Sequence, residues 1–201
     1  MFTGLVQSKA VVKAIIPQGS GCLLQLETPK NLPIPELGDS IATNGCCLTV
    51  TRFDDQVWEF EAGAETLSRT SLGKLSAGSF VNLETSMKLG DKIGGHLVTG
   101  HVDGLGTVVR RDEDGRWSTF WIQVPKSIAK QLASKGSIAV DGVSLTLVDV
   151  SEDQFSVALI PHTLEFTTLG TIKAGDVVNL ETDVLAKYVQ RQLEFLPGIS
   201  N

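Results

Sequence analysis

The sequence predicts an all-β fold made of two tandem homologous, six-stranded, Greek-key-like β-barrels followed by a C-terminal α-helix. Three observations predict it. The two halves of the chain repeat one another, each half contains short apolar runs separated by Gly, Asn and Asp, and apolar residues near the C-terminus recur at helical spacing.

The repeat is the most informative feature of the chain. Residues 40–85 align without gaps with residues 137–182, and 18 of the 46 aligned positions are identical. Ahead of this block, with a shift of one residue, Thr3-Gly4 aligns with Thr99-Gly100. Two copies of about 95 residues indicate a domain duplication, because solenoids stack three or more shorter units. The expected units are residues 1–96 and 97–182 as the first and second barrels, and residues 183–201 as the C-terminal helix.

Within each copy the residue pattern is that of short strands. Residues 56–61 and 153–157 roughly alternate between polar and apolar side chains. Residues 11–16, 23–26 and 108–109 are apolar or β-branched runs. About six such strands in each copy predict a closed barrel.

Two helices are expected beside the strands. Residues 127–133 predict a short helix, whereas Pro33 and Pro35 disrupt the matching stretch of the first copy. Residues 183–195 predict an amphipathic helix. Its apolar positions are Leu185, Val189, Leu193 and Leu196.

The C-terminal helix has two possible roles, packing on its own barrel or oligomerisation. The first copy has no equivalent helix and runs instead into Gly90, Gly94 and Gly95. We therefore favour oligomerisation.

Composition excludes several classes of partner. The net charge is -6 and the pI is about 5.1, with Lys and Arg scattered, so no basic stripe can neutralise a nucleic acid backbone. No stretch offers the roughly 18 uninterrupted apolar residues of a membrane span, and the first residues lack a signal-peptide pattern. We expect a cytoplasmic protein with no nucleic acid partner and no membrane association.

Neither disulfides nor metal sites are expected. Cys22, Cys46 and Cys47 cannot all pair internally, and a bridge between the vicinal cysteines would be strained, so the thiols are expected to be reduced. The three histidines, His96, His101 and His162, do not supply a convincing set of metal ligands.

Five segments together carry a resemblance to a known family. They are residues 1–6 (MFTGLV), 44–50 (NGCCLTV), 94–102 (GGHLVTGHV), 141–146 (DGVSLT) and 160–164 (IPHTL). In this order, and spread over the chain from end to end, they resemble the signature segments of the riboflavin synthase family. Each segment alone is a weak signal, but the set is specific.

The resemblance implies a transferase reaction that needs no cofactor. Two molecules of 6,7-dimethyl-8-ribityllumazine exchange a four-carbon unit, which gives riboflavin and 5-amino-6-(ribitylamino)uracil in the final step of riboflavin biosynthesis. Two identical substrates need two similar pockets, so that holding the rings together contributes much of the rate. A neutral heterocycle with a polyol tail calls for hydroxyls, backbone groups and an apolar wall more than for charge.

Carried over by position, the resemblance implies two pockets, with residues 61–66 and 158–163 in loops. The first pocket consists of Cys47, Leu48, Thr49, Glu61, Ala62, Gly63, Ala64, Glu65, Thr66, Gly100, His101, Val102 and Lys135. The second pocket consists of Gly4, Leu5, Val6, Ser144, Leu145, Thr146, Ala158, Leu159, Ile160, Pro161, His162 and Thr163.

The two pockets differ where protons have to move, because Cys47 aligns with Ser144 and His101 aligns with Leu5. We expect His101 and Cys47 to act near the acidic 7-methyl group and the electrophilic C7 of one lumazine. Ser144, Thr146 and Asp183 are expected to orient the other lumazine. The Gly-Gly-His segment is expected to lie in the linker, with a structural role for His96.

The resemblance further implies a homotrimer in which the first barrel of one chain meets the second barrel of its neighbour. Which barrel holds the donor lumazine stays open, as does any association with lumazine synthase. The main alternative is a non-catalytic, antenna-type protein that binds lumazine or flavin, and the presence of His101, Cys47, Ser144 and Thr146 favours the enzyme. A flavin reductase barrel is disfavoured because no GxGxxG segment follows a strand.

Overall fold

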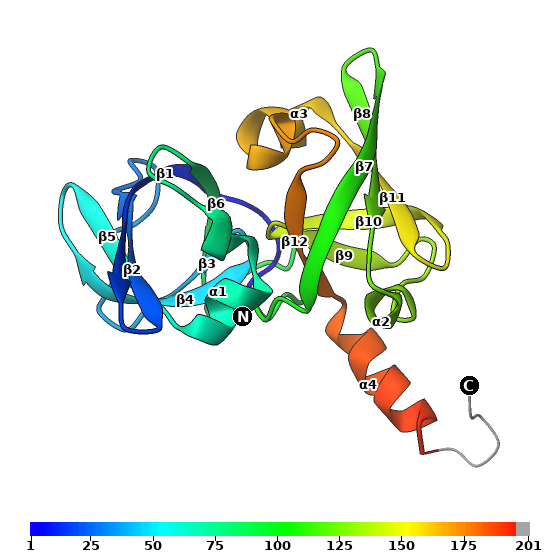
Figure 1. The fold of residues 1–201 in the computed structure, drawn as a ribbon, viewed down its shortest axis with the longest axis horizontal. Coiled ribbons are helices and arrows are strands. Elements are labelled where there is room, and N and C mark those ends of the chain that lie inside the picture. Colours follow the sequence, from blue (N-terminus) through cyan, green and yellow to red (C-terminus); the bar gives the residue numbers. More distant parts are fainter. Residues whose placement is uncertain (196–201) are drawn as a thin grey trace.

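The computed structural model describes residues 1–195 and contains two closed six-stranded barrels, with a helix that projects from the second (Figure 1). The first barrel consists of β1 (Ser8–Gln18), β2 (Gly21–Glu27), β3 (Ser40–Thr43), β4 (Cys46–Phe53), β5 (Val57–Ala62) and β6 (Phe80–Thr85). The second consists of β7 (Gly104–Asp114), β8 (Trp117–Gln123), β9 (Ser137–Val140), β10 (Val143–Val150), β11 (Gln154–Leu159) and β12 (Val177–Thr182). The predicted pair of six-stranded barrels is confirmed.

Both barrels have the same strand order. The first closes in the order β1-β2-β5-β4-β3-β6, and the second repeats this order from β7 to β12. Register shifts between Val12 and Ala14 in β1, and between Val108 and Arg110 in β7, bend the long first strand of each barrel. This bend lets β1 pair with β6 along its first half and with β2 along its second.

Each barrel has its own apolar core, formed by alternate residues of its strands. Trp58, Phe60 and Leu83 are among the fully buried side chains of the first barrel. Phe120 and Phe155 are buried in the second. The duplication is therefore complete at the level of packing.

A short helix and a turn of 3-10 helix follow the fifth strand of each barrel, where the sequence predicted loops. They are α1 (Ala64–Arg69) with η1 (Ser71–Lys74), and α3 (Pro161–Phe166) with η2 (Thr168–Gly170). A helix of six residues is too short to show a hydrophobic period, which explains the wrong prediction. Gly73 and Gly170 permit the tight packing, since a Cβ there would lie 2.3 Å from the Leu67 oxygen and 2.0 Å from the Leu164 oxygen.

The predicted helix over residues 127–133 is shorter in the structure. The helix α2 covers Lys126–Ala129. Beyond it the chain makes tight turns, in which the Gln131 nitrogen donates to the Ile128 oxygen and the Leu132 nitrogen to the Ala129 oxygen. Lys135 then adopts a φ of 69°, because the chain must reverse into β9.

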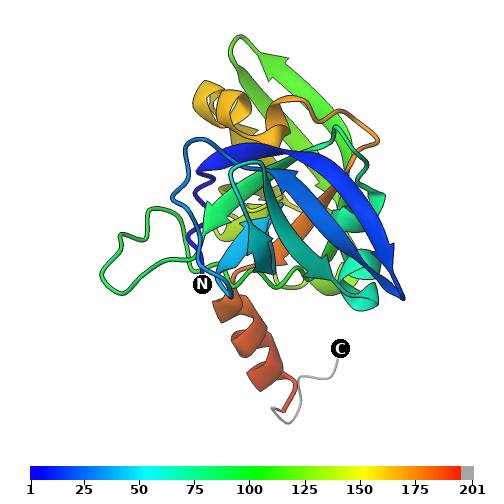
Figure 2. The same cartoon turned by 90° about the vertical axis from the view of Figure 1, so that its left-hand side faces the viewer.

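The C-terminal helix is confirmed as α4 (Val184–Leu193), while Leu196 lies outside the described residues. Figure 2 looks onto the first barrel and shows α4 projecting from the body of the molecule. Lys187 pairs with Asp103 at 2.7 Å and Gln190 accepts a hydrogen bond from Gln131, so one side of α4 is tied to the second barrel.

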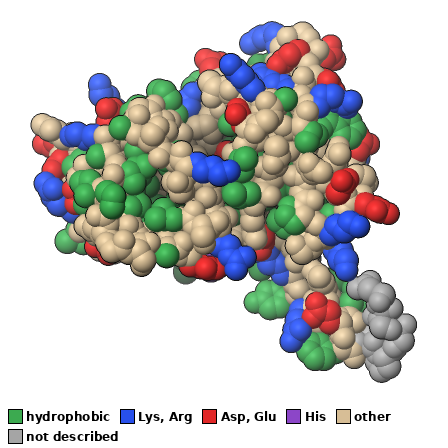
Figure 3. Space-filling view, in the orientation of Figure 1, with side chains coloured by type: hydrophobic (Ala, Val, Ile, Leu, Met, Phe, Trp, Pro, Cys, Tyr) green, Lys and Arg blue, Asp and Glu red, His purple; other side chains and the backbone are tan. Residues whose placement is uncertain are grey.

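Within the described residues, no helix is long and apolar enough to cross a membrane. On the face shown in Figure 3, Lys and Arg lie interspersed with Asp and Glu.

Candidate functional site

The segments that precede the two barrels are exchanged between them. Phe2 and Val98 form an antiparallel bridge, and beyond it each segment runs along the other barrel. Val6 packs against the core of the second barrel, and Val102 packs against the core of the first. Each candidate pocket is therefore built from one barrel and the segment that leads into its sister.

In the first site, the incoming segment lies directly on β4. The Cys47 nitrogen donates to the Gly100 oxygen at 2.8 Å. Gly100 has a φ of 81°, and a Cβ there would lie 2.6 Å from the Cys47 Cβ, so both the conformation and the space require glycine.

The first site is a pocket of about 410 Å³ that brings the predicted thiol and imidazole to one wall. His101 is exposed and Cys47 is half-buried. Cys46 is buried, which raises the pKa of its thiol to about 12, whereas Cys47 is only half-buried and is the more accessible thiol of the pair. The lining residues are Cys46, Cys47, Glu65, Thr66, Arg69, Thr70, Gly100, His101, Val102 and Asp103.

The second site repeats this construction with different chemistry. The Ser144 nitrogen donates to the Gly4 oxygen at 2.7 Å, and a Cβ on Gly4 would lie 2.5 Å from the Ser144 Cβ. Ser144 and Thr146 lie on the same side of β10, as Cys47 and Thr49 do on β4. A hydroxyl thus stands where the first site has a thiol.

His96 belongs to the second site, although the sequence predicted only a structural role for it. Its buried ring places Nδ1 2.7 Å from the Ser144 Oγ, and Nε2 has no hydrogen-bond partner among the described residues. Burial lowers the pKa of His96, and the nearby Asp183 partly offsets this effect. The alignment of the two halves, which pairs Thr3 with Thr99, assigns no residue to His96.

Two buried glutamates hold the exchanged segments in place. Glu84 accepts from the Thr3 nitrogen and hydroxyl, both at 2.7 Å, and from the Gly4 nitrogen at 3.0 Å. Glu181 accepts the equivalent bonds from Thr99 and Gly100 at 2.6 to 2.9 Å. Burial raises the pKa of Glu84, opposed by these hydrogen bonds. Sequence reasoning missed both residues, whose only signal is their place in the repeated Val-Asn-Leu-Glu-Thr segment.

The remaining predicted residues fall into three groups. Leu48, Ala62 and Leu159 are buried and face the barrel interiors. Glu61 is the penultimate residue of β5, Gly63 caps α1, and Ala64, Glu65 and Thr66 lie within α1. On the second barrel Leu145 packs on the core, Ala158 is exposed near the end of β11, Ile160 caps α3, and Pro161, His162 and Thr163 begin it.

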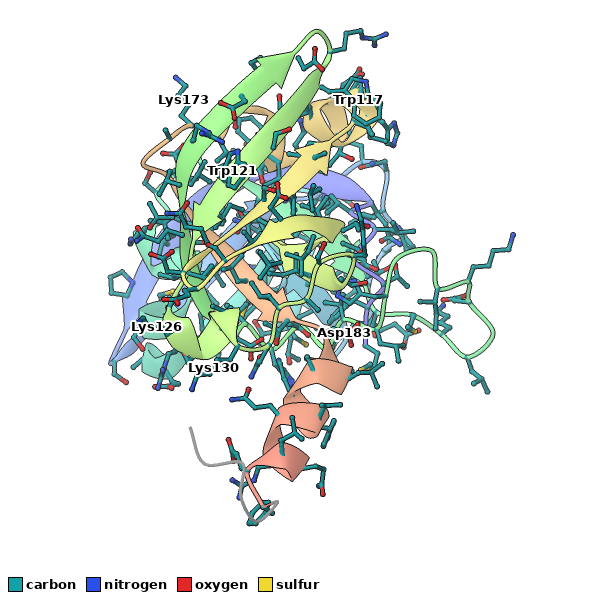
Figure 4. The ribbon with its side chains drawn as sticks, turned by 90° about the vertical axis from the view of Figure 1, so that its right-hand side faces the viewer. Trp117, Trp121, Lys126, Lys130, Lys173 and Asp183 are labelled. Atoms are coloured by element: carbon teal, nitrogen blue, oxygen red, sulfur yellow. The ribbon has the colours of Figure 1, made fainter. Side chains whose placement is uncertain are left out.

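Lys135 lies apart from the first pocket, whereas Asp183 lies near His96 of the second site. Lys135 is exposed, its backbone nitrogen donates to the Leu147 oxygen, and it is not among the residues that line the first pocket. Asp183 caps α4 through a bond from the Leu185 nitrogen at 2.9 Å. Figure 4 labels it where β12 passes into α4. Leu5, near the second site, is exposed and touches Gly94.

The chemistry of both sites is that of hydroxyl, thiol, imidazole and backbone groups. Within residues 1–195, no group of three or more His, Cys, Asp or Glu is arranged to hold a metal ion. The arrangement suits flat, neutral ligands with many hydrogen-bonding groups.

Comparison with protein families and curated sequences gives a consistent result. Residues 3–86 and 99–183 both match the family described as "Lumazine binding domain". The chain is 43% identical to the riboflavin synthase of Brucella abortus (strain 2308), with 97% of this chain and 99% of the relative covered. It is 44% identical to that of Mycobacterium bovis (strain ATCC BAA-935 / AF2122/97), with 95% and 97% covered.

Solved structures also match most of the chain. LumP complexed with riboflavin superposes with a TM-score of 0.83 at 32% identity, covering 90% of this chain and 99% of LumP. LumP complexed with 6,7-dimethyl-8-(1'-D-ribityl) lumazine gives a TM-score of 0.82 at 31% identity, with the same coverage.

Proposed function

The chain belongs to the riboflavin synthase family, and from this membership we propose that it converts two molecules of 6,7-dimethyl-8-ribityllumazine to riboflavin and 5-amino-6-(ribitylamino)uracil. It is an enzyme of the transferase class. One observation carries the proposal: the two sites are built alike from exchanged segments, yet one presents Cys47 and the other presents Ser144. A reaction between two identical molecules in unlike roles needs this combination of similarity and difference.

The proposed division of labour follows the chemistry of each site. Cys47 and His101 act on one lumazine, where an imidazole can exchange the proton of the 7-methyl group and a thiol can add to C7. Ser144, Thr146 and Asp183 orient the other lumazine. The remaining predicted residues bind the rings and the ribityl chains.

The complete catalytic site is proposed to form between two copies of the chain. Lys135 does not line the first pocket of its own chain, and we propose that a neighbouring copy supplies it. The exposed apolar residues of α4 supply a contact surface for a homotrimer. We keep the division into residues 1–96, 97–182 and 183–201, and propose a cytoplasmic location.

The antenna-type alternative shares the fold, since LumP, solved in complex with the lumazine and with riboflavin, has a similar structure. Identity favours the enzyme, because the riboflavin synthases are 40–44% identical to this chain and the LumP structures 30–32%. The retained Cys47, His101, Ser144 and Thr146 agree with that reading.

The test is to incubate the purified full-length protein with the lumazine alone and to follow riboflavin absorbance. Turnover without any added cofactor is expected. Tight binding without riboflavin formation would identify the antenna-type alternative instead.

Replacing His101 with Ala and Cys47 with Ser should abolish most of the turnover, and unchanged turnover in that variant would remove the assignment of these two residues.

Deleting residues 184–201 should give monomers with poor activity, whereas full activity in a clean monomer would contradict the shared site.

A further inference from the structure

The two barrels meet at a pair of equivalent turns. The turns Asn44-Gly45 and Asp141-Gly142 stand back to back, all four residues with positive φ, and a Cβ on either glycine would lie 2.7 Å from the nitrogen of the other. The first turn leads into β4, which carries Cys47, and the second leads into β10, which carries Ser144. Contacts that fix these turns therefore also fix the strands of the two sites.

The strand β12 of the second barrel carries two polar side chains that are fully buried. Asn179 and Glu181 lie two residues apart and alternate with Val178 and Leu180, which belong to the core of the second barrel. Both polar side chains therefore point away from that core. Their exposed fractions are only 1% and 3%, so their polar groups need hydrogen-bond partners within the protein.

These partners belong to three different walls of the first site. The Asn179 Nδ2 donates to the Asn44 oxygen at 2.8 Å, in the turn before β4. The Asn179 Oδ1 accepts from the Ser71 nitrogen at 2.6 Å, at the start of η1 and just beyond α1. Glu181 holds the incoming segment through the bonds described above. One strand of the second barrel thus joins β4, α1 and the incoming segment, all of which line the first pocket.

The strand β6 of the first barrel repeats this arrangement at the second site. The Asn82 Nδ2 donates to the Asp141 oxygen at 2.9 Å, and the Asn82 Oδ1 accepts from the Thr168 nitrogen at 2.8 Å, at the start of η2. Glu84 holds the incoming segment of that site. Each barrel therefore organises the site that the other barrel carries.

We propose that Asn179 is a positioning residue for the first site and that Asn82 is one for the second. The inference rests on the proposed function, which gives each site a lumazine to position. Each amide joins the helix of one site to the strand that carries Cys47 or Ser144, and so fixes the distance between them. A displacement of about 1 Å can cost about 100-fold in rate, so the amide matters although Asn179 is not among the residues that line the first pocket.

The role calls for an amide because a donor and an acceptor have to stand on one short side chain. An apolar residue at position 179 would leave the Ser71 nitrogen and the Asn44 oxygen without these partners in a buried place. The helix and the turn would then no longer be joined.

The test is crossed, since each asparagine should affect only the site carried by the other barrel. Cys47, a half-buried thiol on β4, reports on the first site through its rate of alkylation by iodoacetamide, measured by peptide mass spectrometry. In the full-length protein, Asn179→Ala should raise this rate about 10-fold, the effect of one lost hydrogen bond, and Asn82→Ala should leave it unchanged. Hydrogen exchange over α3 reports on the second site and should become about 10-fold faster only in Asn82→Ala.

Turnover of the lumazine should fall in both alanine variants, by about 10- to 100-fold in kcat with little change in KM, because the groups are displaced and not removed. The matched control is Thr43→Val, which removes a buried hydroxyl next to the Asn44 turn and places there the residue found at the equivalent position, Val140. Alkylation, hydrogen exchange and kcat should all stay at the wild-type values in this control.

Equal acceleration of Cys47 alkylation by the two alanine variants would mean that the asparagines only stabilise the fold, and would overturn the proposal. An unchanged kcat in either alanine variant would do the same. A wild-type protein that forms no riboflavin would refute the proposed function instead, while alkylation and hydrogen exchange would still decide the positioning. If Asn179→Ala does not fold, Asn179→Asp takes its place, because it keeps an oxygen for the Ser71 nitrogen and loses only the amide donor to Asn44.

Discussion

Asp141 is the residue at which the junction between the barrels departs most from its own symmetry. The equivalent position of the first barrel is Asn44. The Asn44 side-chain oxygen accepts a hydrogen bond of 2.7 Å from the Asn82 nitrogen, and one Asp141 carboxyl oxygen accepts a hydrogen bond of 2.7 Å from the Asn179 nitrogen. The carboxyl group is buried, which raises its pKa from 3.8 to about 7. The native state therefore binds a proton that the unfolded state has released over this range of pH.

This difference predicts how stability changes with pH. The stabilisation from Asp141 is complete below the unfolded pKa and is lost as pH rises towards the folded pKa, by a few kcal/mol, on the order of 1.4 per pK unit. Asp141→Asn keeps an oxygen that can accept the hydrogen bond from the Asn179 nitrogen, and asparagine tolerates the positive φ, but the variant has no carboxyl group to titrate. The free energy of unfolding, measured with denaturant at about pH 5 and about pH 8, should fall more between these two pH values for the wild type than for Asp141→Asn. Parallel pH dependences of the two proteins, at equal protomer concentration, would show that Asp141 is ionised throughout.

A second prediction at this scale concerns His96. His96→Asn retains a polar group close to the Ser144 hydroxyl but cannot take up a proton, so turnover should fall by about 100-fold or more with little change in KM. The acid limb of the wild-type rate profile should lie below the ordinary imidazole range, because burial lowers the pKa of His96. That limb should disappear in the variant.

The control for His96 is a double-variant cycle with Ser144→Ala. If the 2.7 Å contact makes the two residues one unit, the double variant should be no slower than the slower single variant. If the rate decreases of the two single variants multiply in the double variant, His96 acts separately from Ser144.

At the scale of elements, the two exchanged segments depend on one glutamate each. Glu181→Ala removes the acceptor for Thr99 and Gly100, so hydrogen exchange over residues 99–101 should become at least about 10-fold faster while residues 3–5 stay protected. Glu84→Ala should give the reverse pattern, and each variant is the control for the other. Equal loosening of both segments in either variant would mean that the segments are not held independently.

How much of each element could be predicted depends on its length and its contacts. Strands such as β5 and β11 carry their own period-2 pattern, and α4 is long enough to show a helical one. The helices α1 and α3 span six residues each, and the 3-10 turns that follow them are fixed by the side chains of Asn179 and Asn82 from the other barrel. Local sequence does not contain that information.

For the whole molecule, the duplication could be predicted from the sequence because both copies kept the same packing residues. The arrangement of the two barrels relative to each other could not be predicted. The exchange of residues 3–6 and 99–102 follows from contacts between residues that are far apart in sequence, such as Gly4 with Ser144. His96 escaped prediction for the same reason, since its partner lies 48 residues further along the chain. Alignment of the halves does not reveal such a residue, because the aligned segments begin after it.

Assembly is the remaining property of the whole molecule, and α4 makes it testable. Its outer face exposes Leu185, Val189 and Leu193 by 66%, 59% and 42%, a spacing of four residues that forms one apolar stripe. If α4 forms the proposed trimer, Leu185→Ser combined with Val189→Ser should give monomers, measured by light scattering coupled to size-exclusion chromatography. Turnover should fall with it if the site is shared between chains as proposed. Leu89→Ser, in an exposed loop outside α4, is the matched control and should leave the trimer intact. A trimer that survives the double substitution in α4 would place the subunit contact elsewhere.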